Sequence, residues 1–131
     1  MFTGKFFKKN EVETLEEDAR KFQSHGQYAE AAENYARAAS AYLDENQLIY
    51  ASRSHEAFRM WLKANNAVKA LELARTVFHV LDDTGWLKKS MEQMLSLILM
   101  IDEFKSAGFT NEAEAFAGEL NKKLAEFGLM L

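Results

Sequence analysis

The chain has 131 residues, a formal net charge of −4 at pH 7 and a pI of about 5.4. This acidic balance excludes a domain whose whole surface attracts nucleic acid, because such binding needs a basic face. The absence of cysteine excludes disulfide bonds and thiolate metal sites, while an apolar fraction of 48% is enough to fill the core of one domain.

Residues 1–10 differ from the rest of the chain because aromatic and basic side chains alternate there: Phe2, Lys5, Phe6, Phe7, Lys8 and Lys9. The lysines interrupt the apolar run, so the segment does not resemble a secretory signal. We interpret it as a tail that precedes a single domain over residues 11–131. Its phenylalanines could cap the first helices, or the segment could be a frayed tail or touch an anionic membrane surface.

Helical spacing dominates the remainder, which contains no proline to interrupt it. Small and apolar side chains recur every three or four residues from Tyr28 to Tyr42. The same pattern returns 39 residues later, from Ala67 to Leu81. It returns again 43 residues after that, from Thr110 to Leu124. The chain therefore carries one helical pattern three times.

Each of these helices follows a residue that tolerates a left-handed turn: Gly26, Asn65 and Gly108. Four residues before each turn residue stands an aromatic side chain: Phe22, Trp61 and Phe104. The repeated unit is therefore a helix, a tight turn and a second, antiparallel helix. The predicted helices cover residues 11–25, 28–45, 48–64, 67–83, 87–107 and 110–127.

Aromatic stripes at helical spacing more often fill a core than bind a ligand. The predicted core aromatics are Phe22, Tyr35, Phe58, Trp61, Phe78 and Phe104. In the third unit, Glu114 and Asn121 replace the small or apolar side chains that the first two units carry at equivalent places. A polar stripe there is what the last unit of a stack needs, since nothing follows to cover it.

The first unit resembles the tetratricopeptide repeat family in its order of large, small, aromatic and glycine positions. The matching residues are Leu15, Ala19, Phe22, Gly26, Tyr28, Ala31, Tyr35 and Ala38. The second unit departs from the family by placing Phe58 at a small position and Asn65 at the glycine position. The spacings of 39 and 43 exceed the family's usual period of about 34, as in longer-helix relatives that include vesicle-fusion adaptors.

The resemblance covers about residues 11–128 and implies an all-α fold of three antiparallel hairpins, hence six helices. It implies that they stack into a short right-handed array, with repeats over about 11–46, 48–83 and 87–128. It also implies that the first helix of each repeat lines a concave groove that holds peptides.

No motif for chemistry stands out in the chain. His25, His55 and His79 fall in different predicted elements without the spacing of a metal motif, and we expect surface or structural roles for them. Phosphate-binding loops and nucleophile elbows are absent from the sequence. We therefore expect no enzyme activity, no cofactor and no metal.

The resemblance places the candidate partner-binding residues on the groove: Arg20, Gln23, His55, Arg59, Lys63, Leu95 and Ile98. The cations among them could pair with carboxylates of a ligand or could be ordinary solvated helix charges. The family's chaperone-binding members clamp a carboxylate with a lysine and two asparagines. Glu16, Arg20 and Glu56 stand at the matching places, so chaperone-tail binding is not transferred.

Leu95 and Ile98 stand where the first two units carry polar residues, so we expect them to be the main contact site for a partner helix or a second copy. The alternative is that the N-terminal segment folds back and covers them with Phe2, Phe6 and Phe7. The predicted function is a protein–protein interaction module that binds a peptide or a helix of another protein. The alternative is a homo-oligomer assembled through the apolar fifth helix. The longest apolar run, Met94–Ile101, is far shorter than the roughly 20 residues of a membrane span, so we expect a cytoplasmic protein without nucleic-acid or membrane partners.

Overall fold

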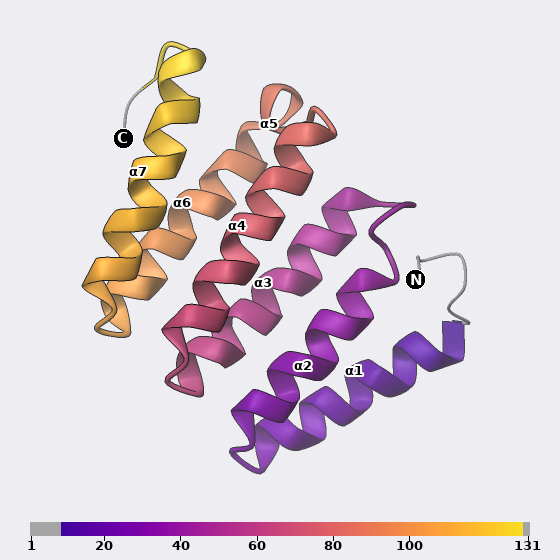
Figure 1. Cartoon of the computed structure of the whole chain (residues 1–131). Helices are drawn as coiled ribbons and strands as arrows, with labels where there is room; N and C mark the ends of the chain where they lie inside the picture. Colours follow the sequence, from indigo (N-terminus) through magenta and orange to yellow (C-terminus); the bar gives the residue numbers. More distant parts are fainter. Residues whose placement is uncertain (1–8, 130–131) are drawn as a thin grey trace.

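The computed structural model describes residues 9–129, and every regular element in that range is an α-helix (Figure 1). The helices are α1 (Lys9–Ser24), α2 (Tyr28–Ser40), α3 (Gln47–Lys63), α4 (Ala67–Asp83), α5 (Trp86–Lys89), α6 (Met91–Ser106) and α7 (Thr110–Glu126). No strand occurs between residues 9 and 129, so the predicted all-α class is confirmed.

The number of helices differs from the prediction, because the described residues form seven helices where six were expected. The helix predicted over 87–107 is two helices, α5 and α6, which are separated at Ser90 by an extended backbone with φ −138° and ψ 107°. The periodicity concealed this break, since Leu87, Met91 and Leu95 keep a spacing of four residues across it. Helix α2 also ends earlier than predicted, at Ser40, and bonds between residues three apart follow it.

The three predicted turn residues all adopt the left-handed conformation. Their φ angles are 74° at Gly26, 59° at Asn65 and 88° at Gly108. In each turn, the residue after the turn residue donates its backbone N–H to the carbonyl of the aromatic residue, which stands four positions before the turn residue. The three N···O distances are 2.8 Å, 2.9 Å and 2.9 Å. The repeated aromatic-to-turn spacing is therefore the signature of one capped helix end, the Schellman motif, used three times.

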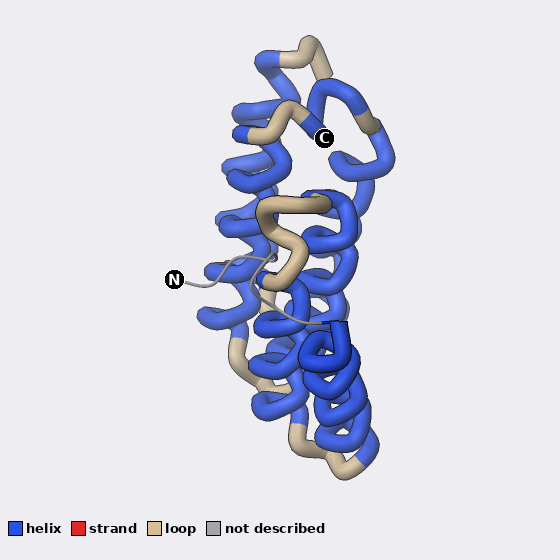
Figure 2. Tube along the Cα trace, turned by 90° about the vertical axis from the view of Figure 1, so that its right-hand side faces the viewer, coloured by secondary structure: helices blue, strands red, loops and turns tan. Residues whose placement is uncertain are grey.

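The long helices lie in two layers, and the two views agree on this arrangement (Figures 1 and 2). One layer holds α1, α3 and α6, which run in the same direction, and the other holds α2, α4 and α7, which run in the opposite direction. Ion pairs join neighbours within a layer, Glu16 to Arg53, Arg75 to Glu119 and Asp82 to Lys123. The first of these pairs joins α1 to α3, and the other two join α4 to α7.

The core fills the space between the two layers. Five of the six predicted core aromatics are buried there: Tyr35, Phe58, Trp61, Phe78 and Phe104. Phe22 was expected to join them but is only partly buried and packs against the core from its edge. The predicted polar stripe of the last helix is confirmed as exposed at Glu114 and Asn121.

Candidate functional site

A groove of about 360 Å³ lies between α3 and α6. Its floor is apolar, because α4 contributes the buried side chains Val77 and Leu81. Leu48 lines it from the start of α3, and Leu99 lines it from α6. We call this hollow the α3–α6 groove. It can accept apolar side chains, since small clefts with an apolar floor and a few polar groups are typical binding sites.

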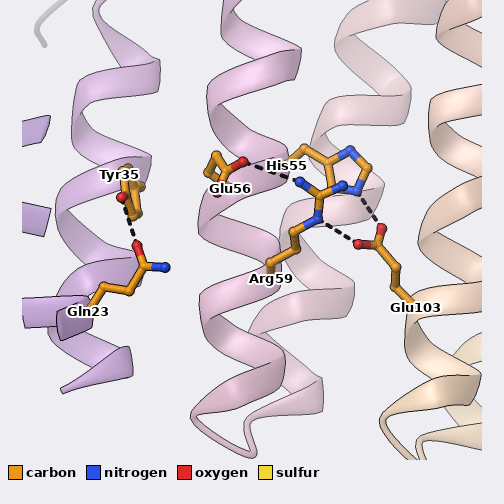
Figure 3. A network of polar contacts seen from close by, with 6 residues as sticks. All are labelled: Gln23, Tyr35, His55, Glu56, Arg59 and Glu103. Atoms are coloured by element: carbon orange, nitrogen blue, oxygen red, sulfur yellow. Dashed lines mark hydrogen bonds and ion pairs between the residues drawn. The ribbon is translucent and has the colours of Figure 1, made fainter. Parts of the chain in front are cut away.

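Four charged or polar side chains form a network at one end of the groove (Figure 3). His55 donates through Nε2 to Glu103 Oε1 at 2.5 Å, and Arg59 donates through Nε to Glu103 Oε2 at 2.6 Å. Arg59 also donates through an Nη nitrogen to Glu56 at 3.2 Å. Because His55 and Arg59 belong to α3 and Glu103 to α6, the network fixes the relative position of these two helices.

The network changes the proton affinity of its charged members. Burial alone would raise the pKa of Glu103, but the hydrogen bonds and charges of His55 and Arg59 outweigh it, and the pKa lies below its ordinary value. Burial would lower the pKa of Arg59, yet the bonds to Glu103 and Glu56 raise it. The Glu103 carboxylate and the Arg59 guanidinium therefore both stay charged at neutral pH.

Two of the predicted site residues, His55 and Arg59, belong to this network. His55 is 9% exposed and Arg59 already has two carboxylate partners, so neither projects freely into solvent. Sequence reasoning did not single out Glu103, which accepts bonds from both. Its partner His55 is 48 residues away in the chain, and only the packing of α6 against α3 brings the two together.

Two other predicted residues lie around a second hollow, of about 400 Å³, near the turns at the ends of α1, α3 and α6. Gln23 and Lys63 both line it. Gln23 accepts a bond of 2.9 Å from the hydroxyl of Tyr35 (Figure 3), and Lys63 lies over the ring of Tyr28, 5.6 Å from its centroid. Arg20 is exposed on α1 and lines neither this hollow nor the α3–α6 groove.

Leu95 and Ile98, the apolar pair of the prediction, have different surroundings. Leu95 is 56% exposed, whereas Ile98 is only partly exposed and packs against the core. Two residues that the prediction missed accompany Leu95 instead, because Met91 is 55% and Leu99 is 44% exposed. The signal was present in the sequence, since residues four apart share one face of a helix. We call Met91, Leu95 and Leu99 the α6 stripe.

Between residues 9 and 129, no group of three or more His, Asp or Glu side chains is placed to hold a metal ion. No helix in the same range is long and apolar enough to cross a bilayer. Comparisons of the chain with protein-family models, with curated proteins and with solved structures find no match.

Proposed function

We propose that this chain is a non-catalytic interaction module, which binds a peptide or a helix of another protein in the α3–α6 groove and along the α6 stripe. The stripe is the observation that carries the proposal. Its three large apolar side chains are each about half exposed, on one helix face that adjoins the α3–α6 groove. Full burial of such a side chain contributes about 1.5–3 kcal/mol, so covering all three would contribute on the order of 2–4 kcal/mol.

The proposal includes a tetratricopeptide-like architecture of three hairpins, α1–α2, α3–α4 and α6–α7, stacked in a right-handed array with α5 as an inserted turn. The same capped turn within each hairpin supports it. Ion pairs between successive first helices support it too, from α1 to α3 and from α3 to α6. In that family, first helices line the groove that holds a peptide, and α3 and α6 are the first helices here.

Apolar contact carries the binding, and charge has a lesser part. Arg59 is engaged by Glu103 and Glu56, so an acidic ligand would have to compete with two carboxylates for it. Arg20 and Lys63 lie outside the α3–α6 groove, near the turns that end α1 and α3, and remain for a carboxylate of a ligand that extends that far. Because both are exposed, such pairs contribute about 1 kcal/mol or less and weaken as salt rises.

The test replaces Leu95 and Leu99 together by serine in the full chain. Wild type and variant serve as baits in lysate of the native cells, and retained proteins are identified by mass spectrometry. We expect a partner that the wild type retains and the variant loses. The matched control is Val68→Ser, which changes a 66% exposed apolar residue on α4 and should retain the partner. Identical sets of retained proteins for all three baits would overturn the proposal.

A second candidate function, a homo-oligomer assembled through α6, is favoured by the symmetry of the stripe. Met91 and Leu99 stand four residues to either side of Leu95. Two antiparallel copies of α6 centred on Leu95 would therefore place each Met91 against a Leu99 of the second copy, as an isologous interface requires. The test is the molar mass in solution, measured by light scattering at protein concentrations from about 1 to 200 μM. A dimer should form as the concentration rises, and Leu95→Ser should keep the chain monomeric.

A further inference from the structure

We infer that the partner segment bound along the α6 stripe and the α3–α6 groove is an amphipathic helix whose flanks carry lysine or arginine. The inference rests on the proposed function, because both use the same surface, and it adds the secondary structure and the charge of the partner. Three properties of the surface carry it. They are the spacing of its apolar side chains, the backbone groups around it and the sign of the charges at its rim.

The stripe has the spacing that one helix uses to pack against another. Met91, Leu95 and Leu99 follow one another at every fourth residue and are all exposed, so they form one of the oblique ridges of a helix surface. Each step of four residues rises about 6 Å along α6. A partner helix with apolar side chains three and four residues apart can place its own ridge beside this one, as helices bound in grooves do.

The backbone around the groove favours a helical partner over an extended one. The walls and the floor belong to α3, α6 and α4, and the backbone N–H and C=O groups inside a helix bond to one another. An extended segment would therefore find few partners for its own N–H and C=O groups, whereas a helix bonds those groups internally. The neutral side chains of Ser52, Gln93 and Ser96 line the groove and can bond the polar flank of such a helix.

Two exposed carboxylates stand along the stripe. At about 100° per residue, Asp102 lies between Met91 and Leu95 around the α6 axis. By the same count, Glu92 lies between Leu95 and Ser96, on the side of the groove. Neither carboxylate forms an ion pair with any residue from 9 to 129. Both are therefore available to a cation of a partner.

The α3 wall of the groove adds to this negative rim. Glu56 and Arg59 are the acidic and basic residues that line the groove within the described part of the chain. Arg59 is bonded to Glu56 and to Glu103, so two carboxylates oppose one guanidinium at this place. The guanidinium is thus neutralised from within the fold, and the charge that remains is negative.

The lysines near α6 lie away from this rim. Lys105 is exposed on the side of the α6 axis opposite Ser96, so it faces away from the groove. Lys88 and Lys89 belong to α5, before α6 begins, and the Nζ of Lys89 lies over the ring of Trp86, 5.4 Å from its centroid. The rim of the stripe and groove is therefore negative along its length, and the complementary flank of a partner helix is basic.

The test measures the binding of two synthetic peptides of about 18 residues to the full chain, a length at which an alanine-rich helix can form. Both carry leucine at every third or fourth position, so they present the same apolar face, and alanine elsewhere except on the flanks. One carries lysine on the flanks and the other carries glutamate. We expect fluorescence anisotropy to show that the lysine peptide binds about tenfold more tightly at low salt. This ratio should fall as added salt screens the rim.

Two protein variants separate the charges of the rim from the net charge of the chain. Glu92→Lys with Asp102→Lys should reverse the preference, so that the glutamate peptide binds more tightly. The matched control, Glu72→Lys with Glu114→Lys, makes the same change of net charge at exposed positions on α4 and α7. It should keep the preference for lysine. Thermal melts followed by circular dichroism check that both variants keep their helices.

A lysine peptide that binds no more tightly than the glutamate peptide would overturn the inference. A preference that both variants keep, or that both lose, would overturn it too, because the charges of the rim would then have no local effect. Two further results have the same consequence. One is that neither peptide binds, and the other is that light scattering shows a dimer of the chain that the lysine peptide leaves intact.

The double change Leu95→Ser with Leu99→Ser distinguishes this failure from that of the proposed function. We expect it to weaken the lysine peptide about tenfold. If both peptides bind wild type equally and both lose affinity to the serine variant, the apolar site stands and the charge of the partner was wrong. If the serine variant binds the lysine peptide as tightly as wild type does, the proposed site itself is wrong.

Discussion

Replacing Glu103 by alanine should destabilise the protein by about 2 kcal/mol at pH 7. The carboxylate accepts from His55, whose side chain is 11% exposed, and the loss of a partner for such a buried polar group costs about 1–2 kcal/mol. Its second bond is to Arg59, whose side chain is 39% exposed and keeps Glu56 as a partner. Solvent screens that pair, so its loss adds about 0.5 kcal/mol.

The effect should depend on pH with a definite sign. Because the folded protein holds the pKa of Glu103 below its ordinary value of 4.5, the stabilisation is fully present above that value. It is lost as pH falls through the lower pKa of the folded state. Urea denaturation at pH 7, 5 and 3 measures this directly. We expect a difference between wild type and Glu103→Ala that persists from pH 7 to 5 and shrinks at pH 3.

The matched control is Glu56→Ala, which removes a carboxylate of the same network. Its side chain is 44% exposed and is bonded to Arg59 within one helix, so we expect a loss below about 0.5 kcal/mol. A loss at pH 7 as small for Glu103→Ala as for this control would refute the claim that the network joins α3 to α6. A difference undiminished at pH 3 would refute the linkage to the carboxylate.

Phe104→Ala should lower the free energy of unfolding by about 3–5 kcal/mol in urea denaturation, because the ring is fully buried and packs edge-to-face on Phe58, with 5.0 Å between the ring centroids. A decrease below about 1 kcal/mol would contradict that packing. Gly108→Ala should cost about 1 kcal/mol or more, since φ is 88° there. Gly108→Asn should cost less, as Asn65 holds the same conformation with φ 59°. Gly118→Ala should instead raise the free energy of unfolding by about 0.5–1 kcal/mol, because this glycine lies within α7 and an added Cβ would meet no other atom within 4 Å. Thermal melts should therefore show a higher melting temperature for Gly118→Ala and a lower one for Gly108→Ala.

The turns of this fold could be predicted because each depends on local chemistry. A residue that tolerates positive φ and an aromatic side chain four positions earlier define the capped end, and both are visible in the sequence. The break at Ser90 could not be predicted, since the apolar spacing continues across it and only Gly85, with φ 80°, marks the turn that precedes α5. The end of α2 at Ser40 was missed because Tyr42 continues the helical pattern into a tighter turn.

The site was predicted in part, and the repeat alignment explains the difference. Leu95 is aligned with Glu13 and Ser52, and all three are exposed, so the alignment identified a solvated position correctly. Ile98 is aligned with His55, which was read as solvated because it is polar. The structure buries His55 against Glu103, so the equivalent place faces a neighbouring helix and Ile98 packs there. Polarity alone does not distinguish a solvated side chain from one that is paired across a helix interface.

The third hairpin supports the proposal that a partner covers the α6 stripe. Helix α7 exposes Glu114 and Asn121 where the earlier units place apolar or small side chains. Helix α6 of the same hairpin exposes the apolar side chains of Met91, Leu95 and Leu99 instead. The buried side chains of α6 already pack toward α3, α4 and α7, so core packing does not explain three further apolar residues on its exposed face. These two adjacent helices thus differ in the side chains that they expose, and the partner contact proposed above, along α6 but not along α7, would account for the difference.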